Sequence, residues 1–159
     1  MTDFGRLLAD LNAAGARYVV IGGIAVIRHG VVRATKDVDI VVAVGDATLD
    51  RVRELLGGWQ ATRPDGSVFD ASRTPTAGWP WQLATRYGLI DILADAAPPL
   101  DLAGMLARAD ERRIEGVPAP VCSLADLVAL KRRAGRPQDI EDLRQLEIAH
   151  GSLPDLPGI

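Results

Sequence analysis

The chain has 159 residues, of which 48% are hydrophobic and 25% are charged, and its formal net charge is −3. This composition is typical of one folded domain, and the net charge argues against a protein whose whole surface binds nucleic acid. With one cysteine and two histidines, the chain can form neither a disulfide framework nor a zinc site built from those residues. Any bound metal must therefore be held mostly by oxygen.

The chain carries no pattern typical of an exported or membrane protein. Its N-terminus lacks the apolar core of a signal peptide, and apolar runs such as 40–44 are far shorter than the ~20 residues that span a bilayer. We therefore expect a soluble, cytoplasmic protein with no membrane partner. The abundance of Ala, Arg, Gly and Leu is typical of a GC-rich bacterial genome.

The first part of the chain predicts alternating helices and strands. Apolar residues at helical spacing predict a helix over 3–14, and short apolar runs predict strands over 18–21 and 37–44. Helices over 24–29 and 46–56 are expected to follow these two strands.

The second part begins with a segment, 60–80, that is rich in Pro, Gly, Ser, Thr and Asp and predicts a loop with at most one edge strand. The elements expected after it are a strand pair over 81–87 and 89–93, a helix over 101–109, a short strand near 113–114, and helices over 124–134 and 138–149. This order predicts an α+β domain with a small mixed β-sheet flanked by helices.

Two carboxylates lie close together on the second strand. Side chains alternate along a strand, so Asp37 and Asp39 point to the same face, where their charges repel each other. A divalent metal or a cationic side chain must offset this repulsion. The alternative is a solvated strand end with Lys36 and Arg33 as counter-charges.

A third carboxylate, Asp91, lies within the otherwise apolar run 89–93. Burying an unpaired carboxylate costs several kcal/mol, so this side chain needs a partner. Asp91 is then either a structural residue, which caps backbone groups or pairs with an arginine, or a metal ligand. In the second case Asp91 completes a site with Asp37 and Asp39 that contains only oxygen ligands, which suits Mg²⁺ or Mn²⁺.

A pair of glycines, Gly22 and Gly23, ends the first strand and opens the next helix. Such a turn lets backbone N–H groups approach an anion such as a triphosphate. The surrounding residues match neither the dinucleotide-binding motif nor the P-loop motif.

Together, these residues resemble the signature of the polymerase-β-like nucleotidyltransferase superfamily. The pattern consists of a strand, a Gly-Gly turn, a spacer and then Asp-x-Asp on the next strand, with a later carboxylate in an apolar run. It is carried by residues 18–44, 88–93 and 130–143, and it is most similar to the small bacterial branch that includes minimal nucleotidyltransferases and AbiEii-type toxins. The resemblance implies a single nucleotidyltransferase domain over 1–159, with a catalytic core at 1–95 and a C-terminal helical part at 100–150.

The C-terminal helices contribute the last part of this resemblance. Lys131 lies on the apolar stripe of its helix, where a lysine either extends to solvent or points into a site. The run 131–142 is similar to a segment of the toxin-like relatives in which a Lys and an Asp face the nucleotide, which implies this role for Lys131 and Asp139 and less strongly for Asp142. Helix-start chemistry after Pro137 is an alternative explanation for Asp139.

The resemblance implies a metal-dependent transfer of a nucleoside monophosphate from an NTP to a hydroxyl. Its implied metal ligands and catalytic residues are Asp37, Asp39 and Asp91, with Mg²⁺ or Mn²⁺ as cofactor. Its implied nucleotide-binding residues are Gly22, Gly23, Arg33, Lys131 and Asp139.

The acceptor stays open between a tRNA, a protein and a small molecule, and a toxin role would add an antitoxin protein as a partner. The alternative is a nucleotide-binding or partner-binding module on the same fold without turnover.

Four other residues are assigned structural roles. His29 precedes Gly30 and is interpreted as a helix-end or packing residue, and Cys122 as a small buried hydrophobe. Trp79 and Trp81 could stack on a base, but covering the edge of the sheet is the favoured interpretation.

Overall fold

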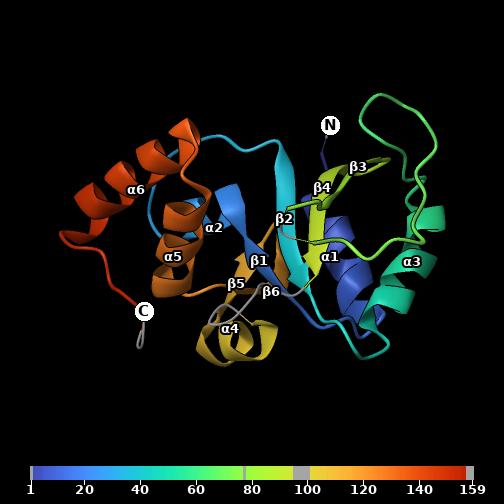
Figure 1. Cartoon of the computed structure of the whole chain (residues 1–159), viewed down its shortest axis with the longest axis horizontal. Helices are drawn as coiled ribbons and strands as arrows, with labels where there is room; N and C mark the ends of the chain where they lie inside the picture. Colours follow the sequence, from blue (N-terminus) through green and yellow to red (C-terminus); the bar gives the residue numbers. More distant parts are fainter. Residues whose placement is uncertain (1, 77, 95–100, 157–159) are drawn as a thin grey trace.

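The computed structural model describes residues 2–76, 78–94 and 101–156, which contain six helices and six strands (Figure 1). The helices are α1 (Phe4–Ala13), α2 (Gly22–Arg28), α3 (Thr48–Gly58), α4 (Leu102–Arg108), α5 (Leu124–Ala134) and α6 (Pro137–His150). The strands are β1 (Tyr18–Ile21), β2 (Asp37–Val42), β3 (Trp81–Thr85), β4 (Gly88–Ala94), β5 (Asp110–Ile114) and β6 (Val117–Val121).

The described strands form one mixed sheet in the order β3-β4-β2-β1-β6-β5. β2 runs parallel to β4, whereas β1 runs antiparallel to β2 and parallel to β6. Helices flank the sheet, so the structure confirms the predicted α+β fold with a small mixed sheet.

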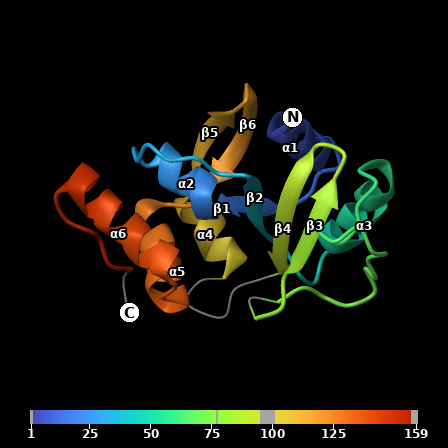
Figure 2. The ribbon, with the colours of Figure 1, turned by 90° about the horizontal axis from the view of Figure 1, so that it is seen from above.

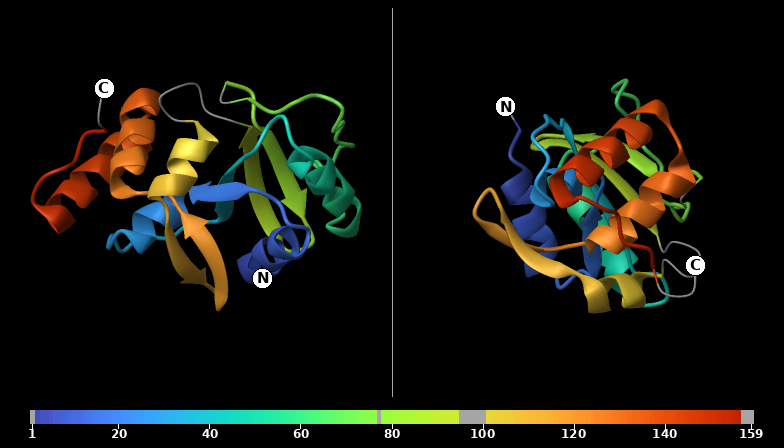
Figure 3. Two further views of the ribbon diagram at one scale, coloured as in Figure 1. Left: turned by 90° about the horizontal axis from the view of Figure 1, so that it is seen from below. Right: turned by 90° about the vertical axis from the view of Figure 1, so that its left-hand side faces the viewer.

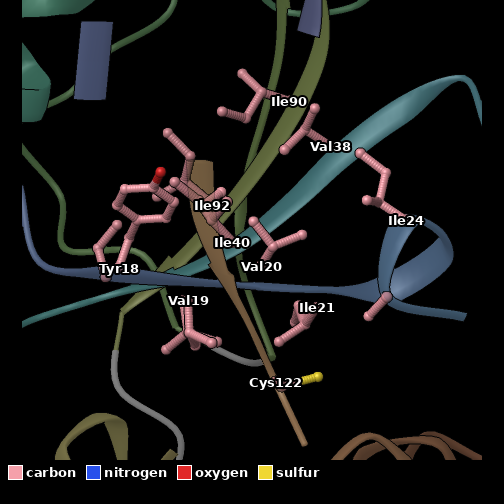
Figure 4. Close-up of a cluster of buried hydrophobic side chains, with 14 of the residues drawn as sticks. Tyr18, Val19, Val20, Ile21, Ile24, Val38, Ile40, Ile90, Ile92 and Cys122 are labelled. Atoms are coloured by element: carbon pink, nitrogen blue, oxygen red, sulfur yellow. The ribbon is translucent and has the colours of Figure 1, made fainter. Parts of the chain in front are cut away.

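One face of the central strands is apolar and forms the core. Val20 on β1, Ile40 on β2 and Ile92 on β4 are fully buried, and Figure 4 shows them on the same side of the strands. Helices α1 and α3 lie on this side (Figures 2 and 3), where the Nε1 of Trp59 donates a hydrogen bond to the carboxylate of Asp10. Because successive side chains of a strand alternate, the intervening residues point to the opposite face.

The opposite face carries the three carboxylates singled out in the sequence. β2 and β4 pair with Asp39 directly beside Asp91, and Ile21 at the end of β1 pairs with Asp39 from the other side. Asp37, two residues before Asp39, shares its face. The register of the sheet therefore places the three carboxylates side by side, next to the turn between β1 and α2.

The region after α4 differs from the prediction of a short strand near 113–114. A hairpin of two five-residue strands, β5 and β6, joins the sheet there, so the 100–150 stretch is not wholly helical. The sequence did not predict β6 because Pro118 and Pro120 cannot donate hydrogen bonds to a ladder. Accordingly, β6 pairs with β1 only at Val121, beyond both prolines.

The remaining elements agree with the prediction to within a few residues. The strand pair predicted over 81–87 and 89–93 is the antiparallel pair β3–β4. The described part of 60–80 is loop, apart from one bridge between Thr62 and Ala84. Helix α2 begins at Gly22, two residues earlier than predicted. No described helix has the length and hydropathy that a membrane span requires.

Candidate active site

Three carboxylates meet on the face of the sheet away from α1 and α3. Oxygen atoms of Asp37 and Asp39 on β2 and of Asp91 on β4 all lie within 4.8 Å of one another, and all three residues are half-buried. The structure therefore brings together the three residues that the sequence predicted as metal ligands.

Burial and the charges of neighbouring carboxylates make Asp39 and Asp91 reluctant to ionise. Burial, together with the charges of Asp37 and Asp91, raises the pKa of Asp39 to about 7, against a smaller lowering by Lys131 and Arg136. Burial, followed by the charge of Asp37, raises the pKa of Asp91 to about 6. The cluster therefore has an excess of negative charge, which the nearby cations Lys131 and Arg136 only partly offset.

The donor set of this cluster fits a hard divalent cation. All its ligand atoms are carboxylate oxygens, which Mg²⁺ and Mn²⁺ prefer. Among the described residues, no ion pair involves Asp37, Asp39 or Asp91. A bound cation would supply the positive charge that no described side chain brings into contact with these three carboxylates.

The turn between β1 and α2 requires glycine because it passes very close to this cluster. Gly22 has φ +65°, and a Cβ atom there would lie 2.6 Å from Cγ of Asp39. A Cβ on Gly23 would lie 2.8 Å from Oγ1 of Thr35. Glycine at position 22 lets the start of α2 pass close to Asp39, and glycine at position 23 lets it pass close to Thr35. The phosphate contacts expected of these two residues stay a prediction.

Thr35 is a site residue that the sequence reasoning missed. Its Oγ1 lies 3.1 Å from the backbone oxygen of Asp37 and 3.3 Å from its Oδ1. The hydroxyl can thus orient the Asp37 carboxylate. A threonine two residues before an aspartate is too common a pattern to indicate such a contact.

An open cleft of about 980 Å³ lies over the cluster. The sheet forms one wall with the three carboxylates, the glycine turn and Gln82 of β3. The loop 33–36, α5 and the start of α6 complete the lining with the cations Arg33, Lys36, Lys131, Arg133 and Arg136, which together form a positive wall. One cleft, large enough for a nucleotide, is thus lined by both a negative cluster and a positive wall.

Lys131 lines this cleft but does not extend to solvent. Its side chain is 8% exposed, and its Nζ lies 3.0 Å from Oδ1 of Asp139 and 2.9 Å from Oδ2 of Asp142. Burial alone would raise the pKa of Asp139, but hydrogen bonds from Arg136 and Lys131 hold it below its usual value. Asp139 therefore holds two cations of the positive wall.

Arg33 joins the same network from the loop before β2. Its Nη1 donates to both oxygens of Asp142, at 2.9 and 2.8 Å. Asp142, the least favoured candidate of the C-terminal run in the sequence, thus contacts both Arg33 and Lys131. The sequence could not show this, since Arg33 and Asp142 are 109 positions apart.

The residues assigned structural roles fit those roles with one exception. His29 is the C-terminal cap of α2, and its Nε2 lies 2.8 Å from the backbone oxygen of Cys122. Cys122 is fully buried, as expected of a small hydrophobic residue. Trp81 is buried in the edge strand β3 and packs edge-to-face on Phe69. The expectation that Trp79 covers the sheet edge is wrong, because this side chain is 68% exposed and stacks on Arg73 instead.

The fold and the clustered carboxylates define a nucleotidyltransferase domain. The chain belongs to a family described as "Nucleotidyltransferase of unknown function (DUF6036)", whose model matches residues 6–153. This assignment supports the superfamily that the sequence resembles, whereas the resemblance to AbiEii-type toxins stays a prediction. No relative of the chain was found among curated proteins.

Solved structures with low sequence identity share this fold. An antigenic nucleotidyltransferase-like protein from Paracoccidioides brasiliensis is 20% identical with a TM-score of 0.62, over 96% of this chain and 76% of that one. The antibiotic-resistance factor ANT(2″)-Ia, in complex with adenylyl-2″-tobramycin, is 15% identical with a TM-score of 0.61, over 93% and 90%. A protein from Thermotoga maritima proposed to be a nucleotidyltransferase is 16% identical with a TM-score of 0.60, over 91% and 93%.

We predict that Gly22→Ala destabilises the protein and weakens its binding of Mn²⁺. The new Cβ would clash with Asp39, and the positive φ alone disfavours alanine by about 1–2 kcal/mol. Urea unfolding and calorimetric titration with Mn²⁺ measure the two effects. Gly45→Ala is the matched control, because Gly45 also has a positive φ (+88°) but a Cβ there meets nothing within 4 Å. Equal behaviour of the two variants would contradict the close approach.

Binding of Mn²⁺ should become tighter as the pH rises from 5 to 8. The raised pKa values of Asp39 (about 7) and Asp91 (about 6) mean that the metal displaces protons at acidic pH, and these protons are absent at pH 8. Calorimetry in buffers of different ionisation enthalpy measures the released protons. A pH-independent affinity without proton release would place the metal elsewhere.

In the presence of a chelator, Asp39→Asn should raise the melting temperature at pH 8. The pKa of Asp39 is higher in the folded than in the unfolded state, so the folded state binds more protons between pH 4 and 7 and loses stability as the pH rises through this window. Asparagine does not titrate, so the variant avoids this loss of stability. Its gain in melting temperature over the parent should therefore shrink toward pH 4. A variant less stable than the parent at pH 8 would show that the carboxylate stabilises the fold.

Proposed function

We propose that the protein transfers a nucleoside monophosphate from an NTP to a hydroxyl acceptor and releases pyrophosphate. The observation that carries this proposal is the cleft in which Asp37, Asp39 and Asp91 face a wall of cations. Membership of a nucleotidyltransferase family supports the same reaction.

The three carboxylates would hold one or two Mg²⁺ or Mn²⁺ ions. When bound, such an ion neutralises charge on the triphosphate and makes its phosphorus atoms more electrophilic. Asp37 and Asp39 lie next to the glycine turn, on the side where the triphosphate would lie, and Asp91 lies on the side of the edge strand β3.

The nucleotide phosphates would lie between the glycine turn and the positive wall. Gly22 and Gly23 have no side chain to obstruct an anion, and Arg33, whose Nη2 would lie 3.4 Å from a Cβ on Gly23, and Lys131 bring positive charge to the same cleft. Asp139 contributes by fixing Lys131 at 3.0 Å. In a phosphoryl transfer of this kind, the protein acts mainly by positioning groups and stabilising charge.

Asp91 would act as the general base toward the acceptor. Its pKa of about 6 leaves it ionised at neutral pH but still able to take a proton. The acceptor oxygen forms a bond to the α-phosphorus, its proton passes to Asp91, and the bond from the α-phosphorus to the pyrophosphate oxygen breaks. Gln82 lies directly beside Asp91 in the β3–β4 pairing and lowers the pKa of this carboxyl, so its side chain can hold the carboxylate in place.

The acceptor is the open part of this proposal. ANT(2″)-Ia carries an adenylylated aminoglycoside in its structure. The toxin-like resemblance points instead to a tRNA or a protein, with an antitoxin as a further partner. Each of these acceptors presents a hydroxyl, so the reaction at Asp91 is the same in all three cases.

The sharpest test of this reaction is Asp91→Asn. This nearly isosteric change removes the base, so we predict unchanged binding of Mn²⁺–NTP within a fewfold and loss of transfer by several orders of magnitude. Transfer is measured with NTPs labelled at the α-phosphate and total RNA, total protein or aminoglycosides as acceptors.

Asp110→Asn, an exposed aspartate on β5, is the control and should keep the parent's activity. An Asp91→Asn variant that transfers at the parent rate would contradict the role of Asp91. A parent protein that binds Mg²⁺–NTP but modifies none of the acceptors would identify a binding module without turnover.

A further inference from the structure

Asp142 occupies an unusual place behind the positive wall. It is 2% exposed and does not line the cleft. Its carboxylate nevertheless accepts hydrogen bonds or ion pairs from three side chains: Arg33 (2.8 and 2.9 Å), Lys131 (2.9 Å) and Gln138 (3.0 Å). All three of these donors do line the cleft. Asp142 would therefore not contact a nucleotide bound in the cleft, but it contacts three side chains that would.

The three donors come from separate parts of the chain. Arg33 lies in the loop between α2 and β2, which runs beside the C-terminal helices in Figure 1, and Lys131 and Gln138 belong to α5 and α6. No local structure fixes Arg33 relative to Lys131. Their common partner Asp142 does so, because Arg33 contacts both carboxylate oxygens and Lys131 contacts one of them.

We propose that Asp142 is a positioning residue that holds Arg33 and Lys131 in the orientation required to bind the triphosphate. This inference rests on the proposed function. Asp142 itself touches neither the nucleotide nor the metal, and it acts only through the two cations.

The net charge of the network allows an experiment to distinguish two roles of Asp142: positioning the cations and neutralising their charge. Arg33, Lys131 and Arg136 bring three positive charges, and Asp139 and Asp142 bring two negative ones, so one positive charge remains. Loss of the Asp142 charge would make the wall more positive. If Asp142 only neutralised charge, its removal would therefore strengthen the binding of a polyanionic NTP. If it positions the cations, its removal weakens binding.

The test is the Asp142→Asn variant, titrated calorimetrically with Mg²⁺ complexes of ATP, GTP, CTP and UTP in turn. Both oxygens of Asp142 accept from Arg33, so either orientation of the asparagine places an NH₂ group against the guanidinium. We expect an affinity lower by about tenfold, typical of a lost charge-assisted contact. Binding of Mn²⁺ without nucleotide should stay within about twofold of the parent.

A double-mutant cycle with Arg33→Gln distinguishes positioning from a general loss of stability. Because Asp142 acts through Arg33, Asp142→Asn should have a much smaller effect on affinity in the Arg33→Gln background than in the parent. Asp155→Asn is the control: it removes the exposed ion pair with Arg132 near the same helices and should leave affinity unchanged.

Three outcomes would overturn the inference: an affinity that rises in Asp142→Asn, an affinity that stays the same while only the melting temperature falls, or effects of the two substitutions that add. If Asp142→Asn does not fold, Arg33→Lys tests the same contact, because lysine keeps the charge but not the shape of the guanidinium. It should also bind NTP more weakly, and parent-like binding would overturn the inference. A parent that binds no Mg²⁺–NTP would instead refute the proposed function.

Discussion

The repulsion among three half-buried carboxylates is the constraint on which the rest of this structure depends. The parallel register of β2 and β4 sets Asp39 beside Asp91, and strand alternation adds Asp37 to the same face. This arrangement is unfavourable in the isolated protein, as the raised pKa of Asp39 indicates. A fold gains nothing from such a cluster, so its presence is best explained by a ligand that brings positive charge.

The neighbouring structure fits around this cluster. Gly22 lets the chain turn within contact distance of Asp39, and the Thr35 hydroxyl lies against Asp37. The apolar face of the same strands anchors the cluster to the core through fully buried residues such as Ile40 and Ile92. The carboxylates thus lie on rigid strands, whereas the cations opposite them come from helices and a loop.

The positive wall depends on its own buried carboxylates. Lys131 would be a buried charge without partners if Asp139 and Asp142 did not flank it, and each of these is itself buried. The C-terminal helices therefore have a role beyond covering the sheet. They fix the cations that line the same cleft as the three carboxylates.

The sequence alone was sufficient for the features that depend on local pattern. Alternation placed Asp37 and Asp39 on one face, and the apolar run around Asp91 marked it as a residue in need of a partner. It was insufficient where contacts join distant segments, as between Arg33 and Asp142, or where prolines mask a strand, as in β6. It also left Lys131 open between solvent and site, because the two buried carboxylates that hold it become apparent only once α6 packs beside α5.

The central claim is that one cleft holds a divalent metal on the three carboxylates and a triphosphate against the cations. A crystal structure with Mn²⁺ and a non-hydrolysable NTP analogue, with anomalous data for manganese, tests it most directly. We expect an anomalous peak within coordination distance of oxygens of Asp37 and Asp39, with the phosphates between Gly22 and Lys131. Manganese bound away from these carboxylates, or a nucleotide bound outside the cleft, would contradict it.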